Sequence, residues 1–250
     1  MSLLCLFGMI SVSAETITVA VASNFAPVAP EIAARFEAET GHSIRISFAS
    51  TGKLYTQIMH GAPFDVLLAA DIKHPQLLES SGQGVASSRS TYAIGRLMLW
   101  SRDPALRGTN CRDTLANLGQ KRLAIANPET APYGAAAKET LISLNLWDQV
   151  EPRLVIGESI AQTLQYVVSG NASLGFIAAA QSHLERLPEM TCAWPIPPQL
   201  HQPIEQQAVL LQHGADNTVA AYFMVFLHGT TGRAIIANHG YTLPIQPHDK

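Results

Sequence analysis

Three short apolar segments in the first third of the chain decide the fold: ITVAVA at Ile17–Ala22, SIRISF at Ser43–Phe48 and FDVLLAA at Phe64–Ala70. Each has the length and apolar content of a β-strand. Apolar residues at helical spacing fill the two intervals, over 28–36 and 54–59. The order strand, helix, strand, helix, strand predicts a mostly parallel sheet that is covered by helices.

A similar unit recurs in the second half of the chain. We expect strands at Arg122–Ala126, Leu154–Ile156 and Ser173–Ile177, separated by helices at Tyr133–Leu146 and Ser159–Val168. A chain of 250 residues is accommodated more readily by two lobes than by one domain. We therefore predict an α/β protein with two Rossmann-like lobes and mixed, mostly parallel sheets, with 15–97 and 204–250 in lobe 1 and 98–203 in lobe 2.

Two extended apolar runs, Gly95–Ser101 and Gln206–Gln212, lie between or beside these units. We interpret them as the two crossings between the lobes. Helices expected at Thr218–Leu227 and Gly232–His239 would return the chain to lobe 1. Because no flexible linker or low-complexity tract is present, the lobes should be joined by a short, two-crossing hinge.

The N-terminus has the character of a signal peptide. Met1 to Ala14 are almost all apolar or small and end in Val12-Ser13-Ala14, although the usual basic residues before the apolar run are absent. No later stretch approaches the eighteen consecutive apolar residues of a membrane span. We therefore expect 1–14 to be a signal peptide and the remaining chain to be periplasmic.

Removal of the signal peptide would leave Cys111 and Cys192 as one possible pair. A disulfide is expected of such a pair in an oxidising compartment. Two unrelated thiols are the alternative, because the sequence does not give the distance between them.

Composition and motifs exclude several classes of function. A net charge of −3 without a cluster of Lys and Arg argues against a nucleic-acid surface. Gly52-Lys53 lacks the rest of a P-loop, and the nine histidines show no metal-binding spacing. No nucleophile motif is present, so we expect no catalytic residues. Asp65 and Asp71 are interpreted as loop caps, and the three tryptophans (Trp100, Trp147, Trp194) as packing residues.

Four polar loops lead into predicted helices. They are Ser23-Asn24, Ser50-Thr51-Gly52, Pro132-Tyr133-Gly134 and Ser159-Ile160. The N-terminus of a helix presents free N–H groups and partial positive charge, which suit an anion. Each loop alone is equally well explained as a helix cap. Four loops that face one crevice, without Asp or Glu and with only Lys53 beside them, favour a fully ionised oxyanion held by neutral donors.

The segments VAVASNF, SFASTGKLYTQIMHGAPFDVLLAAD, ANPETAPYG and ESIAQTL, in this order, resemble the molybdate-binding family of type II periplasmic binding proteins. The resemblance covers essentially the whole chain after residue 14. It implies a monomer that captures molybdate, and tungstate as well, between two lobes and delivers it to an ABC transporter permease. It implies no cofactor and no metal bound as a cation. The oxygens of the ligand would be held by Ser23, Asn24, Ser50, Thr51, Tyr133 and Ile160.

The chain departs from one branch of that family at two positions. In that branch a tyrosine hydroxyl follows a late strand, whereas Ala178 follows Leu174–Ile177 here and has no donor side chain. The other branch, with Asn in the first loop and Tyr in the third, matches better. We therefore expect Tyr133 to supply the missing phenol, with a surface cap as the alternative.

The resemblance implies capture by hinge closure, with cavity size as the filter between molybdate or tungstate and the smaller sulfate and phosphate. Three alternatives stay open at this point. The first is a receptor for another oxyanion such as sulfate or phosphate, and the second is an exported enzyme that uses the same crevice. The third is a sensory protein with the same pocket and a different membrane partner.

Overall fold

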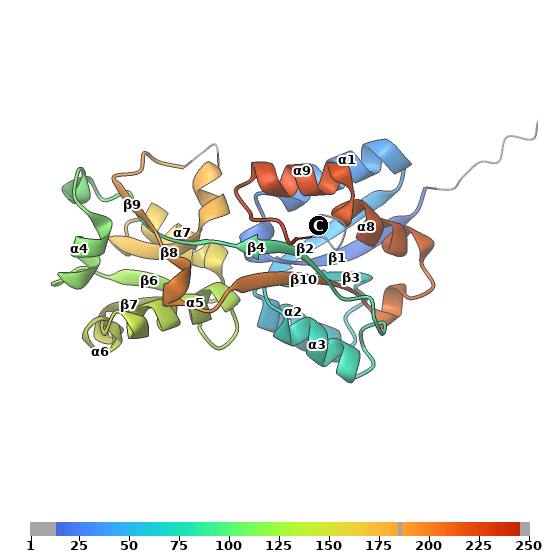
Figure 1. The fold of residues 1–250 in the computed structure, drawn as a ribbon, viewed down its shortest axis with the longest axis horizontal. Coiled ribbons are helices and arrows are strands. Elements are labelled where there is room, and N and C mark those ends of the chain that lie inside the picture. The colour runs from blue at the N-terminus through green and yellow to red at the C-terminus, as the bar shows by residue number, and fades with distance from the viewer. Residues whose placement is uncertain (1–13, 185–186, 246–250) are drawn as a thin grey trace, which may run out of the picture.

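The computed structural model describes residues 14–184 and 187–245, which form two lobes that lie side by side (Figure 1). The predicted signal peptide lies outside the described residues, apart from Ala14. Each lobe is built on a five-stranded sheet, in the order β2-β1-β3-β10-β4 for lobe 1 and β7-β6-β8-β5-β9 for lobe 2. The predicted α/β fold with two mixed sheets is confirmed.

Lobe 1 takes its elements from both ends of the chain. Its strands are β1 (Thr16–Ala22), β2 (Ser43–Ala49), β3 (Val66–Leu68), β4 (Ser90–Gly95) and β10 (Ile204–Leu210). Its helices are α1 (Ala29–Thr40), α2 (Thr51–Met59), α3 (Lys73–Ser80), α8 (Thr218–His228) and α9 (Thr230–Asn238), with short 3-10 helices η1 (Ser23–Phe25) and η6 (Gln212–Gly214). Gly41 ends α1 with a φ of 73°, a conformation that favours glycine.

Lobe 2 is formed by the middle of the chain. Its strands are β5 (Leu97–Ser101), β6 (Leu123–Ala126), β7 (Leu154–Gly157), β8 (Leu174–Ala178) and β9 (Cys192–Pro195). Its helices are α4 (Cys111–Ala116), α5 (Pro132–Ser143), α6 (Trp147–Val150) and α7 (Ile160–Val168), with 3-10 helices η2 (Pro104–Leu106), η3 (Glu151–Arg153), η4 (Ala179–His183) and η5 (Pro198–Leu200). The bounds of β6, β7, β8, α5 and α7 agree with the predicted strands and helices to within a few residues.

Four of the five strands in each sheet run in the same direction. β1 pairs in parallel with β2 and β3, whereas β10 is antiparallel to β3 and β4. In lobe 2, β6 pairs in parallel with β7 and β8, and β5 is antiparallel to β8 and β9. The reversed strands, β10 and β5, are the first that the chain forms after each crossing between the lobes.

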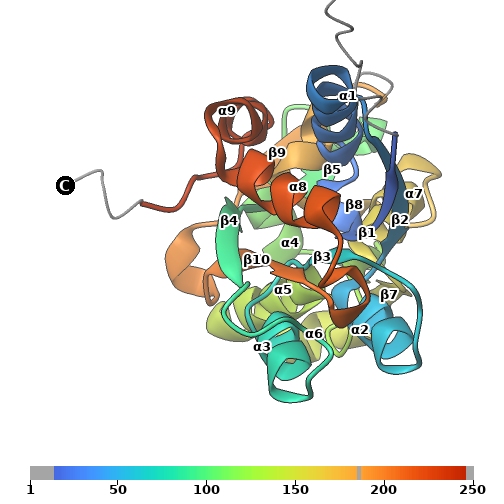
Figure 2. The same cartoon turned by 90° about the vertical axis from the view of Figure 1, so that its right-hand side faces the viewer.

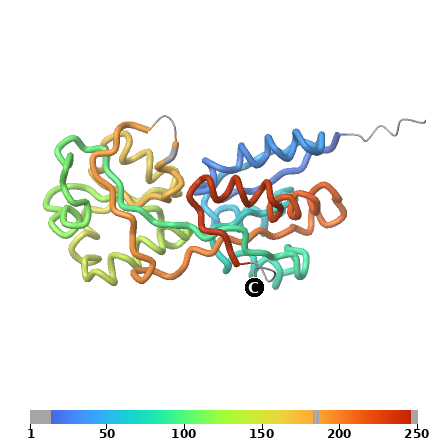
Figure 3. The backbone as a smooth tube through the Cα atoms, turned by 45° about the horizontal axis from the view of Figure 1, so that its top comes forward, coloured from blue at the N-terminus to red at the C-terminus, as the bar shows by residue number. Residues whose placement is uncertain are grey.

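Both predicted crossings lie largely in strands, but the first run contains a crossing and the second does not. The chain first crosses at Arg96, between the end of β4 and the start of β5, within the predicted run Gly95–Ser101. The second crossing is 201–203, between η5 and β10, because Ile196 and Leu200 still pack in lobe 2 and Gln206 already lies in β10. The two connections pass next to each other between the lobes (Figure 3). An alternating apolar run has the same pattern inside a sheet as in an extended connection, so the pattern could not separate the two.

Helices cover both faces of the lobe 1 sheet (Figure 2). One apolar core lies between the sheet and α1, α8 and α9, and a second lies against α2 and α3. The lobes also share core: Ala22 and Ala70 of lobe 1 pack in the main cluster of lobe 2, and Ala180 of lobe 2 packs in the cluster of lobe 1. The two lobes are therefore in direct contact, in a closed arrangement.

The predicted disulfide is confirmed. Cys111 at the start of α4 is bonded to Cys192 at the start of β9, with 5.6 Å between their Cα atoms. The bond joins segments that are 81 residues apart in the sequence.

Over 14–184 and 187–245, no single helix has the length and apolar content of a membrane span. The pair α8 and α9, bent by 57° at the break between them, meets that criterion by length and composition when taken together.

Candidate functional site

All six residues predicted to hold an oxyanion line one cavity between the lobes. The cavity is small: its free volume is about 10 Å³, far below that of an ordinary ligand pocket. Its walls are Ala22, Ser23, Asn24, Ser50, Thr51, Ala70, Ala131, Pro132, Tyr133 and Ile160. The cavity therefore suits a ligand of a few atoms.

Each wall of the cavity is a loop at the carboxyl end of a strand. Ser23 follows β1 and Ser50 follows β2 in lobe 1, where short connections lead directly into η1 and α2. In lobe 2, α5 begins at Pro132 and α7 begins at Ile160. The first N–H groups of a helix have no partner within the helix, so these starts direct backbone donors and positive potential towards the crevice.

Two hydroxyl groups of lobe 1 have protons available for a hydrogen bond to a ligand. Ser50 is 3% exposed, and its Oγ has no hydrogen-bond partner among the described residues. Ser50 is also the N-cap residue of α2, but its side chain makes no capping bond. The Oγ1 of Thr51 accepts a hydrogen bond from the N–H of Ala70 at 3.0 Å, which leaves its own proton available.

Tyr133 brings a buried phenol from lobe 2 to the lobe boundary. It is 1% exposed, so the alternative of a surface cap is wrong. Burial raises the pKa of Tyr133 well above its usual value, and the neighbouring Tyr241 and Tyr92 add to the shift. The phenol is therefore a neutral donor throughout the neutral pH range. A Cβ on Gly95 of β4 would overlap the Tyr133 hydroxyl, so only glycine allows this approach.

The side chain of Asn24 faces a buried network that the sequence did not reveal. Its Nδ2 donates to Gln206 Oε1 at 2.9 Å and to Tyr241 Oη at 3.1 Å. Both amide protons are thus in use, and the donor that Asn24 can offer to the cavity is its backbone N–H. Tyr92, Gln206 and Tyr241 lie far apart in the sequence and in no motif, so no local signal could have identified this network.

The start of α7 is fixed from two sides. The Oγ of Ser159 caps the helix by accepting from Gln162 N at 3.3 Å. Gln181, which is 2% exposed, donates from Nε2 to Ile160 O at 3.2 Å and accepts at Oε1 from Ala178 N at 2.9 Å. The Ile160 peptide is therefore held rigidly at the cavity wall. Ala178 offers no side-chain donor.

The ten residues that line the cavity carry no charge. One ion pair beside the cavity loops joins the lobes: Lys53 of α2 contacts Glu158, just before α7, with 2.5 Å between Nζ and Oε2. Both side chains are about half exposed, so this pair adds little net field to the cavity. The electrostatics of the site come from dipoles, which favour a fully ionised anion over a cation.

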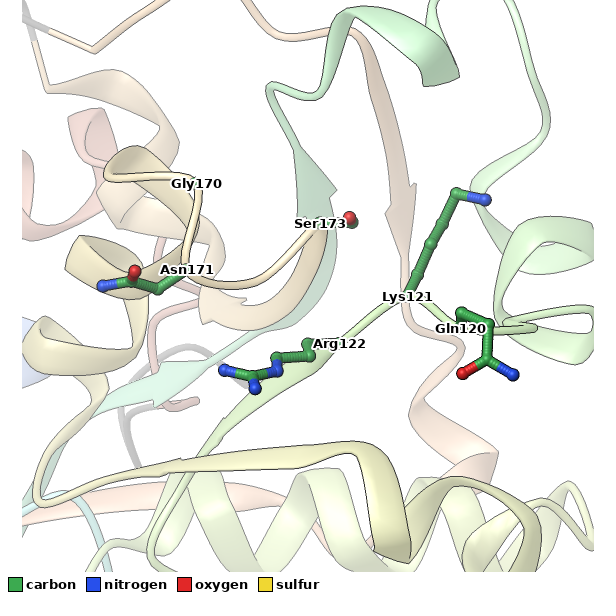
Figure 4. Close-up of a pocket in the computed structure, with 6 residues that line it drawn as sticks. All are labelled: Gln120, Lys121, Arg122, Gly170, Asn171 and Ser173. Atoms are coloured by element: carbon green, nitrogen blue, oxygen red, sulfur yellow. The ribbon is translucent and has the colours of Figure 1, made fainter.

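Other candidate sites lack convergent groups. A larger hollow of about 490 Å³ at the far end of lobe 2 is open to solvent, and its Lys121 and Arg122 side chains point away from each other (Figure 4). Within the described ranges, no three His, Cys, Asp or Glu side chains are grouped to hold a metal ion. Asp65 accepts from Thr18 N at 2.6 Å and contacts His213, and Asp71 accepts from His74 N at 3.0 Å. These two carboxylates anchor loops, as predicted.

Comparisons with known proteins agree with the resemblance of the loops. Residues 17–242 match the family model described as bacterial extracellular solute-binding protein. The molybdate-binding protein ModA of Azotobacter vinelandii is 43% identical over 238 residues, which are 94% of each chain. ModA of Rhodobacter capsulatus is 40% identical over 229 residues, 92% of this chain and 89% of the relative. Both relatives are named as binding proteins and not as enzymes, in agreement with the prediction that the chain is not an enzyme.

The fold agrees as well. The solved structure of the Azotobacter vinelandii periplasmic molybdate-binding protein superposes with a TM-score of 0.85, at 39% identity, and covers 92% of this chain and 100% of its own. The match includes both lobes and every cavity loop between residues 17 and 242. The chain therefore belongs to the bacterial extracellular solute-binding proteins, in the branch of the molybdate-binding proteins.

Proposed function

We propose that this protein is the periplasmic binding component of an ABC transporter and that it captures molybdate. The observation that carries the proposal is the cavity between the lobes, which is small, uncharged and lined by donors, with the Ser50 hydroxyl buried and unpartnered among the described residues. An unsatisfied buried hydroxyl is costly, and an anion oxygen in the cavity would satisfy it. The relatives at 43% and 40% identity are named for molybdate.

In this function, the anion first meets the lobe 1 donors, which are the hydroxyls of Ser23, Ser50 and Thr51 and the N–H groups at the start of η1 and α2. Closure of the hinge then brings the Tyr133 hydroxyl and the Ile160 N–H onto the remaining oxygens. The ligand stabilises the closed form because only that form supplies both halves of the cage. The closed form would be the one that a membrane permease recognises.

Selectivity follows from size and protonation. Molybdate and tungstate have nearly the same radius, so tungstate should bind as well. Sulfate and phosphate are smaller and would leave some donors beyond hydrogen-bond distance. Phosphate also carries a proton at neutral pH, and that proton needs an acceptor, whereas the groups that face the cavity act as donors. We further propose that the protein acts as a monomer after cleavage of residues 1–14.

Isothermal titration calorimetry on ligand-free protein tests the proposal, with molybdate, tungstate, sulfate and phosphate titrated separately. Tight binding of molybdate and tungstate, with no measurable heat from sulfate or phosphate, is the expected result. Binding of sulfate or phosphate with comparable affinity would contradict the size filter. Absence of molybdate binding would contradict the function itself.

A further inference from the structure

Gln206 occupies the centre of the buried polar network at the lobe boundary. It is fully buried, on β10, close to the second crossing. A register shift between Gln206 and Gln207 interrupts the pairing of β10 with β4, so that Gln206 lies opposite Ala93 and Gln207 lies opposite Thr91. Such irregularities in a strand redirect a side chain. Here the redirected side chain reaches the phenol of Tyr133, on the other lobe.

The amide orientation of Gln206 is determined by its partners. Its Oε1 accepts from Tyr92 Oη at 3.0 Å and from Asn24 Nδ2 at 2.9 Å. With the oxygen occupied by two donors, the nitrogen faces Tyr133, and Nε2 donates to Tyr133 Oη at 3.2 Å. The phenol of Tyr133 is therefore an acceptor towards Gln206.

The neighbouring tyrosines do not offer Tyr133 a competing donor. Tyr241 Oη donates its proton to Asn24 O at 2.9 Å, and Tyr92 Oη directs its proton to Gln206 and to Ala69 O. A phenol has one proton and can accept as well as donate. When Gln206 fills the acceptor position of Tyr133, the proton of Tyr133 has two acceptors within reach, the neighbouring Tyr241 Oη and a ligand oxygen in the cavity. A charged oxyanion is the stronger acceptor of the two.

We propose that Gln206 is a positioning residue for oxyanion capture, which orients the Tyr133 hydroxyl so that its proton points at the anion. This role rests on the proposed function. Gln206 belongs to lobe 1 and Tyr133 to lobe 2, so their hydrogen bond joins the lobes in the closed arrangement, in which Tyr133 also lines the cavity. The reverse amide orientation would consume the Tyr133 proton and leave the anion without it.

A double-mutant cycle tests whether Gln206 acts through Tyr133. Molybdate affinity is measured by calorimetry for the unmodified protein, Tyr133→Phe, Gln206→Met and the double variant. We expect each single variant to bind about tenfold more weakly, and the double variant to bind as Tyr133→Phe does. Losses that multiply in the double variant would show that Gln206 does not act through Tyr133. Gln207→Met is the matched control, since Gln207 contacts Arg89 and Thr91 instead of the cavity network.

Gln206→Glu supplies a second readout. It keeps an acceptor for Tyr92 and Asn24 at this position, so it remains available as a test if Gln206→Met fails to fold. An ionised carboxylate can only accept, so it would take the Tyr133 proton, whereas the protonated acid can donate as the amide does. Molybdate affinity of Gln206→Glu should therefore fall as the pH rises from about 6 to 9. The titratable groups that face this position are Tyr92, Tyr133 and Tyr241, and burial raises the pKa of all three. None of them should titrate in that range.

Adding Gln206→Glu to the Tyr133→Phe variant distinguishes an effect on the orientation of the Tyr133 hydroxyl from simple repulsion between the glutamate and the anion. In that background the added glutamate should leave affinity nearly independent of pH, because no phenol proton remains to be captured. A pH dependence of equal size with and without the phenol would assign the effect to repulsion and overturn the positioning role. If the Gln206 variants bind molybdate as well as the unmodified protein does, the positioning role is overturned and the proposed function stays intact. Unmodified protein that does not bind would overturn both.

Discussion

The backbone N–H of Gly52, at the start of α2 in lobe 1, donates a hydrogen bond of 2.9 Å to the carbonyl of Thr130 in lobe 2. A Cβ at position 52 would lie 3.0 Å from both Cα and O of Thr130, closer than ordinary van der Waals contact. The two lobes thus meet backbone to backbone beside the cavity, and the absence of a side chain at Gly52 permits this approach.

Gly52→Ala should weaken ligand binding without harming the ligand-free fold. Within lobe 1, alanine is a better helix former than glycine by about 1 kcal/mol, so the unfolding free energy should stay constant or rise. Closure must displace Thr130, so molybdate affinity should fall. Calorimetry and urea denaturation on the same variant measure the two effects. A loss of stability in proportion to the loss of affinity would show that position 52 matters for the fold and not for closure.

Ser50→Ala should separate stability from binding even more clearly. The Ser50 hydroxyl has no hydrogen-bond partner within the described part of the chain, so its removal deletes an unsatisfied buried group and should not destabilise the ligand-free protein. Molybdate affinity should fall about tenfold, because a donor to the anion is lost. Ser159→Ala is the matched control at another N-cap, where the hydroxyl does accept from Gln162 N. This control should cost about 1 kcal/mol of stability, measured by urea denaturation.

The disulfide should stabilise the fold and leave binding unchanged. The bond between Cys111 and Cys192 joins residues 81 positions apart, for which chain entropy predicts about 4.5 kcal/mol. Neither cysteine lines the cavity. Reduction, or the Cys111→Ser and Cys192→Ser pair, should lower the urea midpoint, while molybdate affinity stays the same. Free thiols in unreduced protein that lacks residues 1–14 would contradict the pairing.

His228 should make the fold sensitive to mild acid. Burial and then the nearby Arg233 lower the pKa of His228 from 6.5, and its Nε2 contacts Ser90 Oγ at 2.7 Å. The unfolded chain takes up the proton first as the pH falls, so the stability present above about pH 6.5 is lost below it. His228→Gln should flatten the decline in unfolding free energy between about pH 7 and 5. The same substitution at the exposed His60 serves as control and should keep the full decline.

The sequence predicted much of the fold because the signals were local. Strand and helix periodicity placed the strand-helix-strand-helix-strand unit of each lobe. Polar residues at helix starts indicated the four cavity loops, and the resemblance to a known family implied the six residues within them. Gln206 shows where local signals end: its strand was interpreted as a crossing, and its partners Tyr92 and Asn24 are separated from it by 114 and 182 positions. Contacts between residues so far apart in the sequence depend on how the chain folds as a whole. A short sequence pattern contains no information about them. The side-chain contacts of Asn24 escaped sequence analysis for the same reason, since its amide faces this network.

The most direct test of the central claim is a crystal structure of the protein grown with molybdate, with anomalous scattering recorded at the molybdenum edge. Closure of two lobes around an oxyanion predicts one strong peak in the cavity bounded by Ser50, Tyr133 and Ile160, with ligand oxygens within hydrogen-bond distance of those residues. A peak at the open hollow beside Arg122, or no ordered molybdenum at all, would contradict it.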